Sequence, residues 1–296
     1  MDKATQDKSV SLVLGSGGAR GLAHIGVIRW LLDNGYTIRS IAGASMGAVV
    51  GAVFASGKLE QFAEWVLALE RADVLRLLDP AFNRAGLFKG ERVMAALRAL
   101  IGDGDIRDLP VAFTAVAMDL ETGKEIWLRE GSLFDAVRAS IAIPLLLTPV
   151  QRDGLTLVDG GLVNPVPVAP TLNDRTGLTV AVNCGGRYET MPAPPQSDSI
   201  PAAGGDYRRR ILAFLDSLQS ARETGLAAPD MISIGLRSME AMENTIARFK
   251  LAANSPDAVI ELPRNACRIH EFWRAEEMIV LGRERTARVF ESRCIA

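Results

Sequence analysis

A serine framed by glycines is the first feature of this sequence that could do chemistry. Gly43-Ala44-Ser45-Met46-Gly47 has the pattern Gly-x-Ser-x-Gly and lies between an expected strand and an expected helix. A serine in this pattern occupies a sharp, strained turn that needs the flanking glycines and exposes the hydroxyl oxygen. The N-terminus of the following helix favours developing negative charge. Ser45 is therefore the candidate nucleophile, and Gly43 and Gly47 are the glycines that permit the turn.

A glycine-rich loop earlier in the chain could bind an anion. Gly15–Gly21 (GSGGARG) separates an apolar strand from a helix, so its backbone N–H groups have little side-chain cover. These groups could bind a phosphate or the oxyanion of an acyl-transfer intermediate. A dinucleotide site fits poorly, because Gly21 comes one residue late for Gly-x-Gly-x-x-Gly and the second strand ends in GASMG rather than an acidic residue. No Lys-Ser/Thr pair follows for a Walker site, so the oxyanion interpretation is the stronger.

A serine nucleophile needs a base, because a free hydroxyl reacts poorly at neutral pH. Asp159-Gly160-Gly161 follows an expected strand and offers an aspartate beside bare glycines. The two histidines of the chain are His24 and His270. The order serine, aspartate, His270 matches that of α/β-hydrolase triads, but we interpret His270 as a surface or capping residue and His24 as a packed one. A Ser–Asp dyad is the simpler arrangement.

A layered α/β domain with a mostly parallel sheet is predicted by the strand–loop–helix succession that positions these residues. Expected strands are Val10–Leu14, Ile38–Ala42, Val111–Met118, Lys124–Leu128, Leu178–Asn183 and Ala258–Leu262. Expected helices are Leu22–Asn34, Ala48–Ser56, Leu59–Leu78, Gly90–Ile101, Phe134–Ser140, Arg208–Arg222, Ile232–Ala253 and Ile269–Val289. Asp153-Gly154 predicts a hairpin between the apolar runs Pro144–Val150 and Leu155–Val158.

The composition narrows the class of protein. The 296 residues fit a polar tail at 1–9 and one domain over 10–296, with the motif-bearing core at 10–184, a mobile Pro-rich loop at 187–206 and a helical part at 207–296. The 33 Lys and Arg nearly balance the 35 Asp and Glu, so no nucleic-acid footprint is present. Three cysteines without CxxC spacing disfavour a disulfide scaffold and a zinc site. We expect no cofactor or metal, no signal peptide or membrane span, and a cytoplasmic location.

Three motifs in the same order resemble the patatin-like phospholipase family. They are the segment from Leu14 to Val27 (LGSGGARGLAHIGV), GASMG at 43–47, and VDGGLVNPVP from Val158. The likeness also covers ASIAIP at 139–144 and the segment from Phe272 to Gly282, so it extends over nearly the whole chain. It implies a three-layer α/β/α fold and a Ser–Asp dyad that acts on ester-linked acyl chains.

Carried over by position, the resemblance makes Ser45 the nucleophile and Asp159 the base. It places the oxyanion hole at the N–H groups of Gly17 and Gly18, with Met46 N–H as a further donor and Arg20 as the basic residue of that loop. Ser16 departs from the three glycines with which the family's motif often begins. The remaining motif glycines are Gly21, Gly43, Gly47, Gly160 and Gly161.

The function expected from these residues is a serine hydrolase that cleaves carboxylic esters of lipids (phospholipid, lysophospholipid or acyl ester) through an acyl-enzyme. A transacylase using the same site, or a non-catalytic regulatory protein that binds acyl ligands, are the alternatives. A lipid substrate makes peripheral membrane contact an option; the oligomeric state is left open. The cationic stretches Leu87–Ile101 and Arg208-Arg209-Arg210 could touch head groups, but the first fits a core-facing helix and the second a solvated face.

Overall fold

One eight-stranded sheet forms the centre of the computed structural model, which describes residues 7–77, 90–191 and 231–294. The strand order is β5-β6-β3-β2-β1-β7-β8, and β4 pairs with β3. The pairs among β3, β2, β1, β7 and β8 are parallel, whereas β4, β5 and β6 pair antiparallel. The bounds are β1 (Ser9–Leu14), β2 (Thr37–Ala44), β3 (Ala112–Asp119), β4 (Glu125–Leu128), β5 (Val150–Arg152), β6 (Leu155–Asp159), β7 (Leu178–Gly186) and β8 (Ala258–Pro263).

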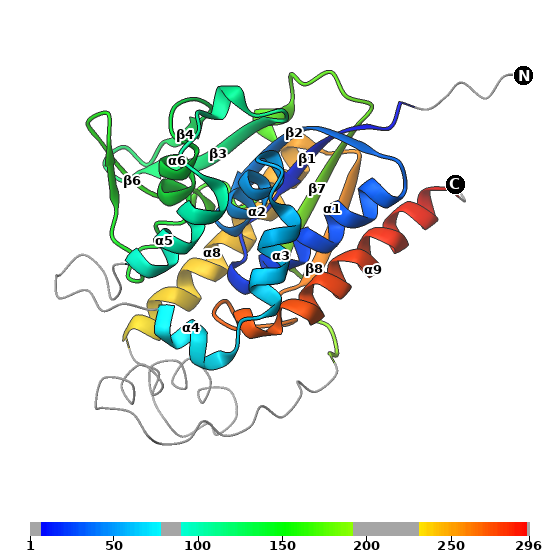
Figure 1. The fold of residues 1–296 in the computed structure, drawn as a ribbon. Helices are drawn as coiled ribbons and strands as arrows, with labels where there is room; N and C mark the ends of the chain where they lie inside the picture. The colour runs from blue at the N-terminus through cyan, green and yellow to red at the C-terminus, as the bar shows by residue number, and fades with distance from the viewer. Residues whose placement is uncertain (1–6, 78–89, 192–230, 295–296) are drawn as a thin grey trace, which may run out of the picture.

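Helices cover both faces of this sheet, as Figure 1 shows. The described α-helices are α1 (Ala23–Asp33), α2 (Met46–Ala55), α3 (Leu59–Leu67), α4 (Arg71–Leu77), α5 (Glu91–Ile101), α6 (Leu133–Ser140), α8 (Met231–Asn254) and α9 (Ala275–Cys294). A 3₁₀ turn, η1 (Gly18–Leu22), connects the glycine loop to α1, and another, η5 (Phe272–Arg274), precedes α9.

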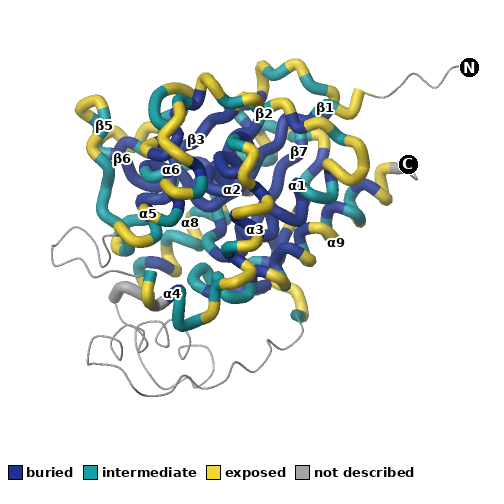
Figure 2. The backbone as a smooth tube through the Cα atoms, viewed as in Figure 1, coloured by how far each residue is buried: buried dark blue, intermediate teal, exposed yellow. Residues whose placement is uncertain are grey.

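The alternation of side chains along β1 divides the core in two. Leu12 and Leu14 belong to the large cluster packed under α1 and α2, whereas Val13 belongs to a small cluster with Ala181 of β7 and Ala247 of α8. Since neighbouring strand residues point to opposite faces, α8 lies on the face opposite α1 and α2. The sheet is therefore the buried middle layer of an α/β/α arrangement (Figure 2), as expected from the sequence.

Most predicted elements are present, and three differ. The described part of the predicted helix Leu59–Leu78 forms two helices, because Asp73 accepts a hydrogen bond from Glu70 N–H and α4 starts there. Pro144–Val150 is mostly turn, with Leu145 at a φ of 70°, and only Val150 joins β5. The helix predicted from Ile269 begins at Ala275, because the preceding residues contact the glycine loop.

Other predictions concern the periphery of the molecule. The hairpin is β5–β6, with Asp153 and Gly154 both at positive φ. Within α5 the residues Met94, Leu97 and Ile101 are buried, so this helix faces the core. Arg208–Arg222, and the Pro-rich loop beyond residue 191, lie outside the described residues. In the described ranges no helix is long and apolar enough to cross a membrane.

Candidate active site

The two glycine motifs meet at one edge of the sheet. β1 and β2 are parallel neighbours, with Leu14 opposite Gly43, so their carboxyl ends deliver the glycine loop and Ser45 side by side. Ligand sites of parallel sheets form at this edge. Ser45 is buried, being 4% exposed, and has φ 53° and ψ −123°. A non-glycine residue at positive φ is strained, as expected of a serine at a strand-to-helix turn.

The glycines around Ser45 are required by close packing. A Cβ at Gly43 would lie 2.5 Å from the backbone of Gly47, and one at Gly47 would overlap the carbonyl of Leu14. The turn can therefore form only because both positions lack a side chain. The same holds for Gly21, where a Cβ would lie 2.6 Å from the Met46 side chain.

Ser140 of α6 holds the turn from the side. Its hydroxyl accepts a hydrogen bond from Ser45 N–H at 3.0 Å and donates one to the carbonyl of Val116 in β3 at 2.6 Å. Ser140→Ala removes the acceptor of the Ser45 N–H and one donor to the Val116 carbonyl. We expect it to destabilise the fold by about 1–3 kcal/mol and to lower kcat more than KM. Chemical denaturation and ester kinetics measure these effects; unchanged stability and turnover would show that Ser140 has no such role.

Asp159 ends β6 beside this turn. One carboxylate oxygen, Oδ1, accepts a hydrogen bond from Gly161 N–H at 2.7 Å. The other, Oδ2, is buried with no hydrogen-bond partner within the described residues. Burial raises the pKa of Asp159 to about 7, against the opposing effect of the nearby Ser45 hydroxyl and of the hydrogen bond from Gly161 N–H. A carboxylate with a pKa near the working pH and an uncommitted oxygen is suited to accept a proton.

The glycine loop presents two backbone donors. Ser16 N–H donates to the carbonyl of Pro165 and Ala19 N–H to that of Ile269. The amides of Gly17 and Gly18 make no such bond to any acceptor in the described part of the chain. Gly18 has a φ of 55°, and a Cβ there would lie 2.6 Å from the Ile269 carbonyl. Backbone N–H groups that are not bonded within the protein are one requirement of an oxyanion-binding loop.

Arg20 makes its contacts away from Ser45. Its guanidinium donates to Glu240 of α8 and to the carbonyl of Arg264, both at 2.8 Å. The side chain is 6% exposed, so the ion pair joins the glycine loop to α8 inside the protein. The N–H of Arg20 donates to Gly17. In this structure Arg20 therefore fixes the loop.

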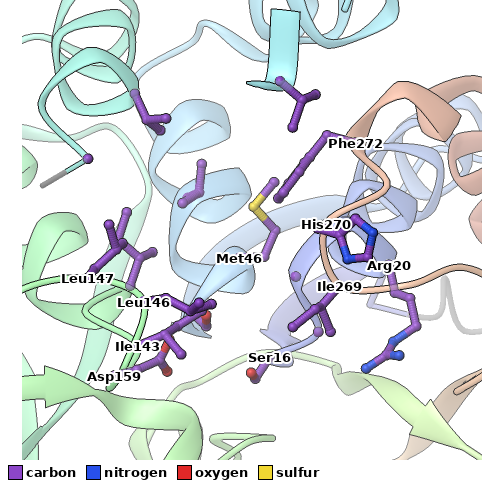
Figure 3. Close-up of a pocket in the computed structure, with 18 of the residues that line it drawn as sticks. Ser16, Arg20, Met46, Ile143, Leu146, Leu147, Asp159, Ile269, His270 and Phe272 are labelled. Carbon is purple, nitrogen blue, oxygen red and sulfur yellow. The ribbon is translucent and has the colours of Figure 1, made fainter. Parts of the chain in front are cut away.

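The two histidines occupy different positions. His24 is fully buried, its Nε2 lies 2.8 Å from the carbonyl of Gly15, and burial lowers its pKa to about 4. It supports the glycine loop as a neutral ring, in agreement with the packed role expected for it. His270 is partly exposed and lines the cavity wall across from Asp159, as Figure 3 shows.

An apolar cavity of about 280 Å³ opens above Ser45 and Asp159. Its walls come from α3, α4, α5, α8 and the segments around Ile143 and Phe272. Figure 3 shows Met46, Leu146 and Leu147 above Asp159, and Phe272 on the facing wall. Concave apolar walls with a few polar groups at one end are typical of a ligand site, here one for an aliphatic chain. No group of His, Cys, Asp and Glu that could hold a metal ion occurs in the described ranges.

Two acidic residues of α8 that no sequence motif singles out also line the cavity. Glu240 pairs with Arg20, and Glu243 accepts a hydrogen bond from the Ser16 hydroxyl at 3.4 Å. Burial and the charge of Asp159 raise the pKa of Glu243 to about 8. No local signal marked them, because a glutamate on a helix that mixes apolar and polar residues has the pattern of a solvated face.

Comparison with known proteins identifies the family of the chain. The family model of the patatin-like phospholipases matches residues 12–172. An NTE family protein of Mycobacterium tuberculosis is 36% identical over 98% of this chain and 93% of its own length. The mouse patatin-like phospholipase domain-containing protein 7 is 30% identical over 62% of this chain and 14% of that protein. The crystal structure of VipD from Legionella pneumophila has a TM-score of 0.46 at 14% identity, covering 98% of this chain and 67% of VipD. The chain belongs to the patatin-like phospholipase family and is a lipid acyl hydrolase.

Proposed function

We propose that this enzyme hydrolyses carboxylic esters of lipids through an acyl-enzyme on Ser45, with Asp159 as the general base. The observation that carries the proposal is the buried Asp159, with a pKa of about 7 and a free Oδ2, beside a serine at a strained turn. The apolar cavity above them suits the acyl chain. The relatives whose names include phospholipase support the lipid substrate.

In the first half of the reaction Asp159 takes the proton of Ser45 as its Oγ attacks the acyl carbonyl. The carbonyl oxygen becomes the oxyanion and accepts hydrogen bonds from the amides of Gly17 and Gly18, with Met46 N–H as the third donor. The ester C–O bond then breaks, and the leaving alcohol receives the proton from Asp159. The acyl group remains on Ser45.

In the second half a water molecule replaces the alcohol. Asp159 takes a proton from the water as its oxygen attacks the acyl-enzyme, and the same N–H groups bind the second oxyanion. The bond to Ser45 Oγ breaks, the serine recovers its proton from Asp159, and the fatty acid leaves. Asp159 thus ends each half-reaction in the state in which it began.

The test compares wild type with Ser45→Ala on a panel of p-nitrophenyl esters and phospholipids. We expect wild type to release fatty acid and to react with a fluorophosphonate probe, and the variant to do neither, because both reactions need the Oγ nucleophile. Turnover that survives in Ser45→Ala would refute the proposal. Absence of both labelling and turnover in wild type would favour a protein that binds acyl ligands without cleaving them.

Added lysolipid separates hydrolysis from acyl transfer. If water is the acceptor, the acyl group removed from the substrate appears only as free fatty acid, with or without the added lysolipid. If the enzyme is a transacylase, the acyl group appears on the acceptor and less fatty acid is released. Chromatography of the products from one labelled substrate measures both outcomes.

A further inference from the structure

Glu243 reaches the floor of the active site from a distant part of the chain. Helix α8 packs on the sheet face opposite α1 and α2, and its glutamate lines the same cavity as Ser45 and Asp159. The hydroxyl of Ser16 donates to Glu243 Oε2 at 3.4 Å. The same hydroxyl lies 2.7 Å from the position that a Cβ on Gly161 would occupy. Ser16, which Figure 3 shows next to Asp159, therefore contacts both Glu243 and the turn that carries Asp159.

The charges that face Glu243 come from three elements. Asp159, at the end of β6, and Glu240, one turn earlier on α8, favour its neutral form, as does burial. Arg20, on η1, and the hydroxyl of Ser16 favour the ionised form. Arg20 forms an ion pair with Glu240 at 2.8 Å. The charge of Glu240 therefore largely offsets the effect of Arg20 on Glu243. His270 lies on the same cavity wall.

We propose that Glu243 must carry its proton for catalysis, and that its ionisation switches the Ser45–Asp159 pair off. This inference rests on the proposed function. An ionised Glu243 would place a second negative charge beside Asp159, in a cavity where charges are poorly screened. The same charge would lie near the loop that stabilises the oxyanion, so the transition state would lose part of the stabilisation supplied by Gly17 and Gly18. A neutral Glu243 imposes neither cost.

The test is the pH dependence of kcat/KM between pH 5.5 and 10 with a neutral p-nitrophenyl ester, corrected for the Ser45→Ala background. Wild type should show a bell-shaped profile, because Asp159 must be ionised, with a pKa of about 7, and Glu243 protonated, with a pKa of about 8. Those two values give a fall of about sixfold between pH 7.5 and pH 9. Glu243→Gln, which cannot ionise, should keep the acid limb and show no fall up to pH 9.

Glu240→Gln is the matched control, because it removes a carboxylate from the same helix and the same cavity wall. Its kcat/KM should still fall between pH 7.5 and pH 9. If Glu243→Gln does not fold, Ser16→Ala serves instead. That variant removes a hydrogen bond that favours the ionised glutamate, so its alkaline limb should move to higher pH.

Three results decide the matter. An alkaline limb that is unchanged in Glu243→Gln, or in Ser16→Ala where the first variant does not fold, would overturn the role of Glu243. Loss of the limb in Glu240→Gln as well would show that the site responds to total charge rather than to Glu243. Turnover that does not depend on Ser45 would instead refute the proposed function, and the rate of fluorophosphonate labelling at each pH separates the two failures.

Discussion

Asp159→Asn should lower kcat for ester hydrolysis by about 10²- to 10⁴-fold, the contribution of a general base. The asparagine side chain has the same shape and can still accept the hydrogen bond from Gly161 N–H, which is 2.7 Å long in the wild type. It cannot take the proton of Ser45. KM should change little, because the apolar walls of the cavity bind the acyl chain in both proteins.

The same substitution should raise the stability of the protein at high pH. Burial lifts the pKa of Asp159 from 3.8 to about 7, so the folded protein holds the proton more tightly than the unfolded chain. The free energy of unfolding therefore falls as the pH rises from about 4 to about 7. Asparagine has no charge to bury. The free energy of unfolding of Asp159→Asn should therefore exceed that of wild type by on the order of a few kcal/mol above pH 7, and the two values should be equal near pH 4.

Thermal unfolding at pH 4.5 and pH 8, together with kinetics, checks both halves of this prediction. A variant that is less active and also less stable at pH 8 would assign Asp159 a structural role. His270→Ala tests the triad alternative, because this ring lines the cavity. A loss of turnover in folded His270→Ala as large as that in Asp159→Asn would restore a histidine base.

Gly26→Ala should destabilise the fold strongly without touching the chemistry. Gly26 lies where α1 crosses α9, and a Cβ there would overlap the Ile279 carbonyl of α9. Gly282 of α9 faces the Ala23 carbonyl of α1 in the same way. Figure 1 shows α1 and α9 side by side. Both close contacts are with backbone, which cannot move out of the way as a side chain can.

We expect Gly26→Ala to lower the free energy of unfolding by about 3 kcal/mol, the upper end for overpacking, and to lower Tm by roughly 5–10 °C. Gly104→Ala is the control, because no atom lies within 4 Å of its added Cβ. Calorimetry of the two variants measures the difference. If Gly26→Ala were as stable as Gly104→Ala, α1 and α9 would not be as closely packed as the structure has them.

The parts of the site that consist of residues close together in the sequence could be predicted. Gly43, Ser45 and Gly47 lie within five positions, and their conformation follows from the absence of two side chains. The parallel strands that lead to the loops could also be predicted, because short apolar runs that end at glycines define them. The roles of Ser45 and Asp159 themselves stay predictions until the variants are measured.

Long-range packing determines the parts that could not be predicted. Glu243 lines the cavity only because α8 packs on β7. Ile269 fits a helical pattern, but its carbonyl accepts a hydrogen bond from Ala19 N–H, so the helix starts later. Glu70 and Asp73 form a hydrogen bond that divides one periodic segment into α3 and α4. In the first two cases a tertiary contact overrides a local pattern, whereas the third is a local hydrogen bond between residues three positions apart.

The hydrogen bonds from the glycine loop to the carbonyls of Ile269 and Arg264 have a consequence for protein design. The Gly15–Gly21 sequence alone does not specify where its N–H groups point, because Ala19 is held by Ile269 and Arg20 by Arg264. A designer who grafts this loop onto another strand–helix junction would transfer the glycines without their orientation. The transferable unit is the loop together with the segment from Arg264 to Ile269, two pieces that only the complete fold brings into register.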